Sequence, residues 1–401
     1  MRVLAARSLG GAGHLYPLLP FLSAARGRGD ELLVVGPPAI GAMVEMLGHP
    51  FSAGDEPPEE DVARIRERLP LVPSAEASVL ANRDLFGGMA TEAMLPSTRA
   101  IMAEWVPELV LREPCEYSSA IVAREMTIKT AQVAISSARS ELASIVAATP
   151  ALEAHRAGLA RELVTEPYVT RFPSSVDPAV FPTTVRYRTE TQQPRPLPDW
   201  WHGSGAPLVY VTFGTVLGHM SIAPTVVNTI MRAVWRIPDV RVLLTIGRQL
   251  DPSRVTPLPA NVRLEPWVDQ ADVLAQAAVV VCHGGSGTVF GALAAGVPVV
   301  VVPVFADQFD NGRRVAERGA GLTIEPVRGS EESAPPVIGD GDVDRIGQAI
   351  EAVLAVPGFR AQAAEVAGEM AASTPVGTVL AALQADDPVG VLSGEGVAPT
   401  G

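Results

Sequence analysis

The stretch VVVCHGGSGTVFGALAAGVPVVVVPVFADQFDN, residues 279–311, decides the fold of the second half of the chain. Its order of residue types predicts a buried strand at 279–282 and a glycine-rich turn at 283–287. A short helix follows and ends near Gly296, and a second buried strand occupies 299–304. Strands that alternate with helices in this way predict a parallel sheet with helices on its faces.

The glycine-rich turn has the composition of a phosphate site. Small residues let backbone amides approach a ligand closely, and amides at a helix N-terminus bind anions. His283 adds a donor at the strand end, while Asp307 and Gln308 follow the next strand at the same edge of the sheet, where ligands of open α/β folds bind. An ordinary tight connection remains the alternative for the turn alone. The turn residues are Gly284, Gly285, Ser286, Gly287 and Thr288.

Composition narrows the class of protein. The 401 residues are 47% hydrophobic and 19% charged, enough for two cores, and the net charge of −13 argues against a nucleic-acid or anionic-membrane partner. No apolar run reaches membrane-helix length and the start lacks a signal-peptide core, so we expect a cytoplasmic protein. Cys115 and Cys282 have no metal-binding spacing and suit buried core positions.

Two domains are expected, joined by a linker. Residues 192–207, QQPRPLPDWWHGSGAP, are rich in proline and glycine and show no periodicity. Strand and helix patterns stand on both sides, which predicts an α/β fold of two Rossmann-like, doubly wound domains facing each other across a cleft. We expect these boundaries: an N-terminal domain at 1–195, a linker at 196–207, a C-terminal domain at 208–384 and a flexible tail at 385–401.

His14 and Glu113 are the candidate catalytic residues of the first half. His14 follows a glycine turn at the start of a predicted helix, where a neutral imidazole is favoured, and Glu113 ends another predicted strand at the same sheet edge. A carboxylate there could orient the ring and stabilise the imidazolium. The alternatives are a helix-capping histidine and a surface carboxylate, with Glu116 as a rival acid.

Two further features of the first half leave alternatives open. Gly11 and Gly13 fit the first two positions of a dinucleotide fingerprint, but the third falls on Tyr16, so an NAD-dependent oxidoreductase is poorly supported. Residues 52–98 combine an acidic run with Met- and Phe-containing segments. They would form either helices that cover the sheet or a lid for a lipophilic ligand.

Five segments together resemble the GT-B glycosyltransferases that decorate antibiotics and other natural products. The likeness covers nearly the whole chain, and its C-terminal part is highly specific. The segments are GAGHLYPL from Gly11, VTFGT from Val211, WVDQAD from Trp267, HGGSGT from His283 and PVVVVPVFADQFDNGR from Pro298. The resemblance implies an N-terminal domain that binds a lipophilic small-molecule acceptor, a C-terminal domain that binds a nucleotide sugar, and inverting transfer without a metal or other cofactor.

The resemblance also implies a role for each candidate residue. His14 would be the base on the acceptor hydroxyl and Glu113 its orienting partner, although the family more often has aspartate there. Trp267 would stack on the nucleotide base, with the Val268 backbone at its edge. Asp307 and Gln308 would take sugar hydroxyls. The diphosphate would be surrounded by Gly214, Thr215, His283, Gly285, Ser286, Gly287 and Thr288.

One departure from the family pattern concerns the donor. Plant-type relatives carry a ribose-binding glutamate eight residues after the histidine, where this chain has Gly291. We therefore expect a dTDP-deoxysugar donor. The alternatives are a UDP-sugar enzyme acting on small phenolics or lipids, and a catalytically silent GT-B partner protein; a homodimer is compatible with either. The acceptor, the sugar and the choice of O-, N- or C-glycosylation stay open.

Overall fold

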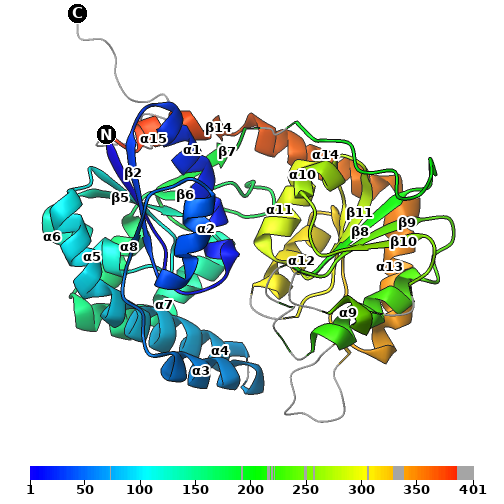
Figure 1. Cartoon of the computed structure of the whole chain (residues 1–401), viewed down its shortest axis with the longest axis horizontal. Helices are drawn as coiled ribbons and strands as arrows, with labels where there is room; N and C mark the ends of the chain where they lie inside the picture. The colour runs from blue at the N-terminus through cyan, green and yellow to red at the C-terminus, as the bar shows by residue number, and fades with distance from the viewer. Residues whose placement is uncertain are drawn as a thin grey trace, which may run out of the picture. The chain divides into compact units, whose positions relative to one another are not determined.

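The chain folds into two compact units, each built on a parallel β-sheet (Figure 1). Unit 1 consists of residues 1–171, 178–190 and 373–401, and unit 2 of residues 172–177 and 191–372. The computed structural model describes the chain except for residues 73, 191–192, 215–216, 218–219, 221, 248–250, 256–257, 305–306, 328–337 and 386–401.

The sheet of unit 1 reverses its winding direction between its first and fourth strands. From β1 the chain winds outward through β2 and β3, and it then returns to the other side of β1 and winds outward again from β4. The strands, from one edge to the other, are β3 (Phe51–Ala53), β2 (Glu31–Gly36), β1 (Arg2–Ala6), β4 (Leu109–Arg112), β5 (Lys129–Val133), β6 (Tyr168–Thr170), β7 (Thr184–Arg188) and β14 (Thr374–Pro375).

Helices cover both faces of this sheet because its strands are apolar on both sides. Phe21 and Leu22 pack on one face together with Leu380, while Met102 and Val122 pack on the other. A π-helical segment, Leu80–Ala90, connects two of the helices. The helices are α1 (Leu19–Gly27), α2 (Gly41–Met46), α3 (Glu59–Arg68), α4 (Ser74–Val79), α5 (Thr91–Trp105), α6 (Ser118–Met126), α7 (Ala138–His155), α8 (Leu159–Thr165) and α15 (Val376–Ala382).

Unit 2 repeats the plan with six parallel strands, and its reversal lies between β8 and β11. The strand order is β10 (Val262–Glu265), β9 (Arg241–Thr245), β8 (Leu208–Thr212), β11 (Ala277–Cys282), β12 (Val299–Val301) and β13 (Gly321–Thr323). The helices are α9 (Ala223–Val234), α10 (Gln270–Leu274), α11 (Ser286–Ala294), α12 (Gln308–Glu317), α13 (Val343–Ala355) and α14 (Pro357–Ala372).

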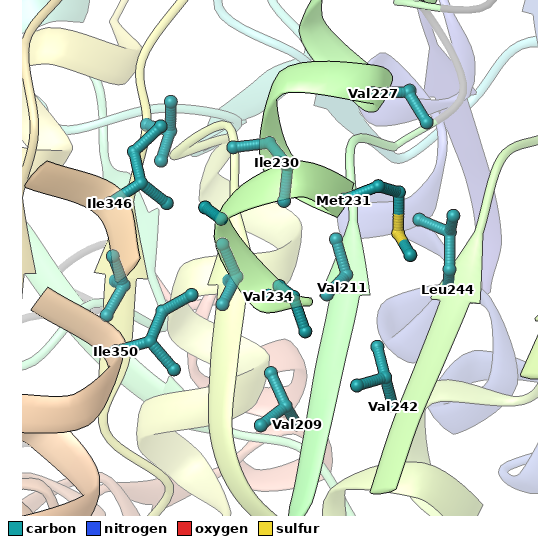
Figure 2. Close-up of a cluster of buried hydrophobic side chains, with 14 of the residues drawn as sticks. Val209, Val211, Val227, Ile230, Met231, Val234, Val242, Leu244, Ile346 and Ile350 are labelled. Carbon is teal, nitrogen blue, oxygen red and sulfur yellow. The ribbon is translucent and has the colours of Figure 1, made fainter. Parts of the chain in front are cut away.

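The core of unit 2 is dominated by β-branched residues, which suit a parallel sheet buried on both faces. Figure 2 shows Ile230 and Val234 of α9 beside Val209 and Val211 of β8 on one of these faces. Phe290 of α11 packs on the opposite face. The strand–turn–helix–strand order predicted for residues 279–311 is present as β11, α11 and β12.

The units differ from the predicted domain boundaries at three places, one of which is residues 193–195, which belong to unit 2 instead of the N-terminal domain. Val379 and Leu380 of α15 pack against Leu22 of α1, so the chain beyond Ala372 belongs to unit 1. Phe172 stacks on Phe290 with ring centroids 3.7 Å apart, which ties residues 172–177 to unit 2. Both contacts join residues far apart in sequence, and no local pattern announces them.

The predicted linker and the predicted tail can also be compared with the structure. The predicted linker lacks helix and strand, yet Trp200 and Trp201 pack on the core of unit 2, and the Trp201 indole donates to the Asn261 carbonyl at 2.9 Å. The expected tail at 385–401 lies outside the described residues, apart from Ala385. Within the described ranges, no helix is both long enough and apolar enough to cross a membrane.

Candidate active site

His14 and Glu113 meet at the reversal point of the unit 1 sheet. Ala6 and Arg112 are register partners at the carboxyl ends of β1 and β4, so the loops that follow these strands are neighbours. His14 Nδ1 lies 3.2 Å from Glu113 Oε1. The His14 side chain is 20% exposed and the Glu113 side chain is fully buried, so the pair presents imidazole rather than carboxylate to solvent.

Backbone amides hold the Glu113 carboxylate in place. Oε1 accepts from the Ser8 N–H at 3.0 Å and Oε2 accepts from the Cys115 N–H at 2.7 Å. Burial alone would raise the pKa of Glu113, but His14 and these two amides outweigh it and leave the pKa lowered. The carboxylate is therefore ionised at neutral pH, as an orienting partner for an imidazolium must be.

His14 lies on a 3₁₀ turn instead of at the start of an α-helix. The turn spans Ala12–His14, and α1 begins only at Leu19. Pro17 and Pro20 lack the amide hydrogen that a continuous helix would need across this stretch. The predicted effect of a helix terminus on His14 is thus wrong.

Close packing positions the His14 ring. Gly10 has a φ of +119°, and a β-carbon there would lie 2.7 Å from the His14 ring. Phe86, from the π-helical segment, stacks on His14 with centroids 5.7 Å apart and planes inclined by 24°. Leu80 and Leu85 of this segment join a small apolar cluster with Leu9. Residues 52–98 therefore cover the sheet with helices and also place an apolar wall beside His14.

Glu116, the alternative acid, binds groups at the start of α6. Its carboxylate oxygens accept hydrogen bonds from the hydroxyl groups of Ser118 and Ser119 and from the Ser119 N–H, at the start of α6. Burial raises its pKa, and these donors oppose the shift. Of the two acids, Glu113 is the one that faces His14.

The reversal point of unit 2 brings Gly214 and His283 together. They follow β8 and β11, whose last residues, Thr212 and Cys282, are register partners. A β-carbon at Gly214 would lie 2.9 Å from the His283 ring, and one at Gly285 would also clash with this ring. The ring thus fills a slot between two glycines. Burial lowers the pKa of His283 to about 4, with the Thr212 backbone opposing the shift, so the ring is neutral at pH 7.

A hydrogen-bond network links the glycine turn to the start of α12. Ser286 Oγ donates to Asp307 Oδ2 at 3.0 Å. The buried amide of Asn311 donates to the Gly284 carbonyl at 2.9 Å, to Ser286 Oγ at 3.0 Å and to Asp307 Oδ2 at 3.2 Å. The network fixes the turn relative to Asp307, four residues before Asn311 on the same helix.

The other predicted donor residues surround this network. Gln308 is 3% exposed, and its Oε1 accepts from the Val304 N–H at 2.8 Å. Gly287 is exposed and Thr288 half-buried in the first turn of α11, whose N-cap, Gly285, has no side chain to cap the helix. Trp267 is 58% exposed. Val268 packs beside the unit 2 core, and Thr215 lies outside the described residues.

Asn311, Phe86 and Gln270 are neighbours of the site that sequence reasoning missed. Asn311 could have been found from its i+4 spacing to Asp307. Gln270 faces Gly291, where an added β-carbon would meet its Oε1 at 2.9 Å. Phe86 lies in one of the Phe-containing segments considered as a lid, but its stacking on His14 depends on the tertiary fold. Over the described part of the chain, no group of three or more His, Cys, Asp or Glu side chains is arranged to hold a metal ion.

Solved structures with the same fold define the class of the protein. The spinosyn rhamnosyltransferase SpnG superposes with a TM-score of 0.76 at 21% identity, over 96% of this chain and 100% of that one. SpnG has also been solved in complex with thymidine diphosphate and with spinosyn aglycone. With its two parallel-sheet units, the chain has the GT-B glycosyltransferase fold.

Sequence relatives then give the family. The elloramycin glycosyltransferase ElmGT of Streptomyces olivaceus is 33% identical over 92% of this chain and 93% of its own length. The L-demethylnoviosyl transferase of Streptomyces niveus is 30% identical over 81% of this chain and 85% of its own. Residues 228–385 match the family described as Erythromycin biosynthesis protein CIII-like, C-terminal domain. The chain belongs to the antibiotic-biosynthesis glycosyltransferases and is an enzyme of that type.

The lowered pKa of His283 predicts a pH effect on stability. The unfolded chain takes up this proton near pH 6.5 and the folded chain only near pH 4, so protonation favours unfolding between these values. His283→Gln removes the titrating group. Its free energy of unfolding, from urea titrations at pH 7 and pH 4.5, should therefore fall less than that of the wild type.

The matched control is His202→Asn, which alters an exposed histidine of the same unit whose positive φ asparagine tolerates. This variant should follow the wild-type pH dependence. The same loss of stability in wild type and His283→Gln would show that His283 does not titrate as described.

Proposed function

We propose that the enzyme moves a deoxysugar from a dTDP-sugar to a hydroxyl group of a lipophilic secondary-metabolite aglycone, with inversion and without a metal ion. The observation that carries this proposal is the His14–Glu113 pair, a partly exposed imidazole backed by a buried carboxylate 3.2 Å away. Such a pair can remove a proton from a hydroxyl group and hold the resulting charge.

The chemistry follows from which imidazole nitrogen is available. Nδ1 faces Glu113, which leaves Nε2 for the acceptor. As Nε2 takes the hydroxyl proton, the acceptor oxygen attacks the anomeric carbon and forms the new C–O bond. The bond from that carbon to the diphosphate oxygen breaks, and its electron pair leaves with dTDP. Attack opposite the leaving group inverts the carbon, and Glu113 stabilises the imidazolium.

Unit 2 supplies the donor site in this proposal. The diphosphate gains negative charge as it leaves, and preorganised amides at a helix N-terminus suit that charge. The glycine turn and the uncapped first turn of α11 offer such amides, and the neutral His283 ring lines the turn beside them. A metal ion is not required for this step.

The remaining contacts to the donor are assigned by exposure. Trp267, 58% exposed, is a platform on which the nucleotide base can stack, with the Val268 backbone at the base edge. Asp307 is partly exposed, and its carboxylate accepts hydrogen bonds from sugar hydroxyls. Asn311 and Ser286 hold this carboxylate in place. Gln308, almost fully buried, holds the Val304 N–H through its Oε1 and is the second residue proposed to contact the sugar.

The apolar wall beside His14 supports a lipophilic acceptor. Phe86 stacks on the imidazole, and Leu9, Leu80 and Leu85 cluster nearby. An acceptor that buries rings against these side chains gains hydrophobic free energy, about 25 cal/mol for each Å² of apolar surface removed from water. Two relatives are named glycosyltransferases of antibiotics, elloramycin and oleandomycin, which agrees with glycosyl transfer to such a molecule.

Removing the base tests the catalytic assignment. His14→Ala should lower kcat by roughly 10²-fold to 10⁴-fold while donor affinity is unchanged, because general-base catalysis contributes about that much. Mass spectrometry of a polyketide aglycone incubated with a dTDP-deoxysugar panel measures the product. Met46→Gln, at the exposed C-terminal end of α2 in the same unit as His14, is the control and should keep turnover. If His14→Ala kept full turnover, His14 could not be the base, although the proposed donor site would be unaffected.

Gly291 generates a prediction about the nucleotide. No carboxylate stands at this position to accept from a ribose 2′-hydroxyl, so dTDP should bind more tightly than UDP, and UDP should gain nothing over dUDP. Gly291→Glu should raise UDP affinity by about tenfold, as one hydrogen bond to a charged group would, because the Gln270 side chain can move aside.

Titration calorimetry with dTDP, dUDP and UDP measures these affinities, with Gly291→Ala as the control for added bulk. If UDP binds the wild type as tightly as dTDP, the enzyme uses a UDP-sugar instead.

A further inference from the structure

The loop that carries Glu113 is held by a buried arginine that the catalytic proposal does not use. Arg112, the last residue of β4, is fully buried. Its Nη1 donates to three carbonyls of the loop: Glu113 at 3.3 Å, Pro114 at 3.1 Å and Glu116 at 2.9 Å. One guanidinium nitrogen thus ties together the turn from which the Glu113 side chain projects.

The rest of the guanidinium is anchored by a second buried residue. Glu166, directly after α8, accepts from Arg112 Nη2 at 2.6 Å and from Nε at 3.2 Å, and its side chain is 1% exposed. Arg124 of α6 adds a contact to the same carboxylate at 3.6 Å but does not reach the loop carbonyls. The guanidinium group of Arg112 therefore joins the loop after β4 to the end of α8.

From these contacts we infer that Arg112, anchored by Glu166, is a positioning residue that sets the Glu113 carboxylate for His14. This inference rests on the proposed function of the His14–Glu113 pair. Glu113 meets His14 Nδ1 only while its loop also keeps the Ser8 and Cys115 amides on the carboxylate. A small shift of the loop would break all three contacts at once.

Lysine cannot replace this arginine. A lysine ammonium is a compact charge on a flexible stem, whereas the planar guanidinium holds its donors in a fixed fork. Arg112→Lys keeps the buried charge opposite Glu166 yet cannot donate to the carboxylate and to three carbonyls from fixed directions. Glu113 should then lose its orientation while the charge balance of the site stays the same.

A double-mutant cycle separates positioning from general stability. Arg112→Lys should lower kcat by about tenfold or more and leave both KM values within about twofold, because only the step that uses the base is affected. In the Glu113→Gln background the same substitution should cost less than about twofold, since its effect passes through Glu113. Circular dichroism and thermal melting show which variants are folded.

Two variants complete the design. Arg124→Met removes the other arginine on Glu166 and should keep kcat within about twofold. Arg112→Met combined with Glu166→Leu removes both charges of the buried Arg112–Glu166 pair together. This variant should fold even if Arg112→Lys does not, and should show the same loss of kcat.

Wild-type kcat in a folded Arg112 variant would overturn the inference. So would an equal loss from Arg112→Lys in the wild-type and Glu113→Gln backgrounds, because that result describes a structural role. Failure of the proposed function is recognised separately: Glu113→Gln alone would then keep wild-type kcat.

Discussion

The structure depends on one topological constraint, the reversal of winding direction in each parallel sheet. At this reversal, one strand is followed by a connection to one side of the sheet, and its neighbouring strand by a connection to the other side. The loops after these two adjacent strands therefore diverge and leave an open position at the carboxyl edge. In unit 1 these strands are β1 and β4, and in unit 2 they are β8 and β11. Every residue assigned to acid–base chemistry or to the diphosphate follows one of these four strands or the neighbouring β12.

In unit 1, the carboxylate at the reversal point, that of Glu113, is fully buried and needs hydrogen-bond and charge partners. An unpaired charge in an apolar interior is very costly, and removing one partner of a buried ion pair costs about 3–5 kcal/mol, a large part of the 5–15 kcal/mol that stabilises a typical domain. Glu113 avoids this cost through two backbone amides and His14. The contacts that keep Glu113 ionised are therefore also those that orient the histidine.

In unit 2, the position of the histidine depends on two glycines, which have no side chain. His283 fits only because residues 214 and 285 have no β-carbon, and Asn311 then ties the turn to α12 by hydrogen bonds to Gly284 and Ser286. An imidazole kept neutral by burial can line a phosphate site without a change of charge near pH 7. Each unit thus places one histidine at its reversal point: His14 beside a buried carboxylate in unit 1 and His283 between two glycines in unit 2.

Much of this could be predicted from the sequence, because strand ends are marked locally. The apolar runs before Glu113 and His283 locate the sheet edge, and the glycines beside them locate the loops. The helix expected at His14 is a 3₁₀ turn, since prolines interrupt the stretch. Phe86 and the attachment of α15 to unit 1 could not be predicted, because each depends on contacts between residues more than 70 positions apart. The contacts of Arg112 with the following loop also depend on the tertiary fold, and the strand pattern of residues 109–112 does not indicate them.

The central claim is that His14, backed by Glu113, removes the acceptor proton, and a structure–reactivity series tests it most directly. Acceptors of one scaffold, with hydroxyl groups from acidic phenols to alcohols, are compared in wild type and His14→Ala by kcat/KM. If His14 is the base, the variant should lose little with the acidic phenols, which are already ionised, and progressively more with the less acidic hydroxyls. A loss of the same factor across the whole series would contradict the account.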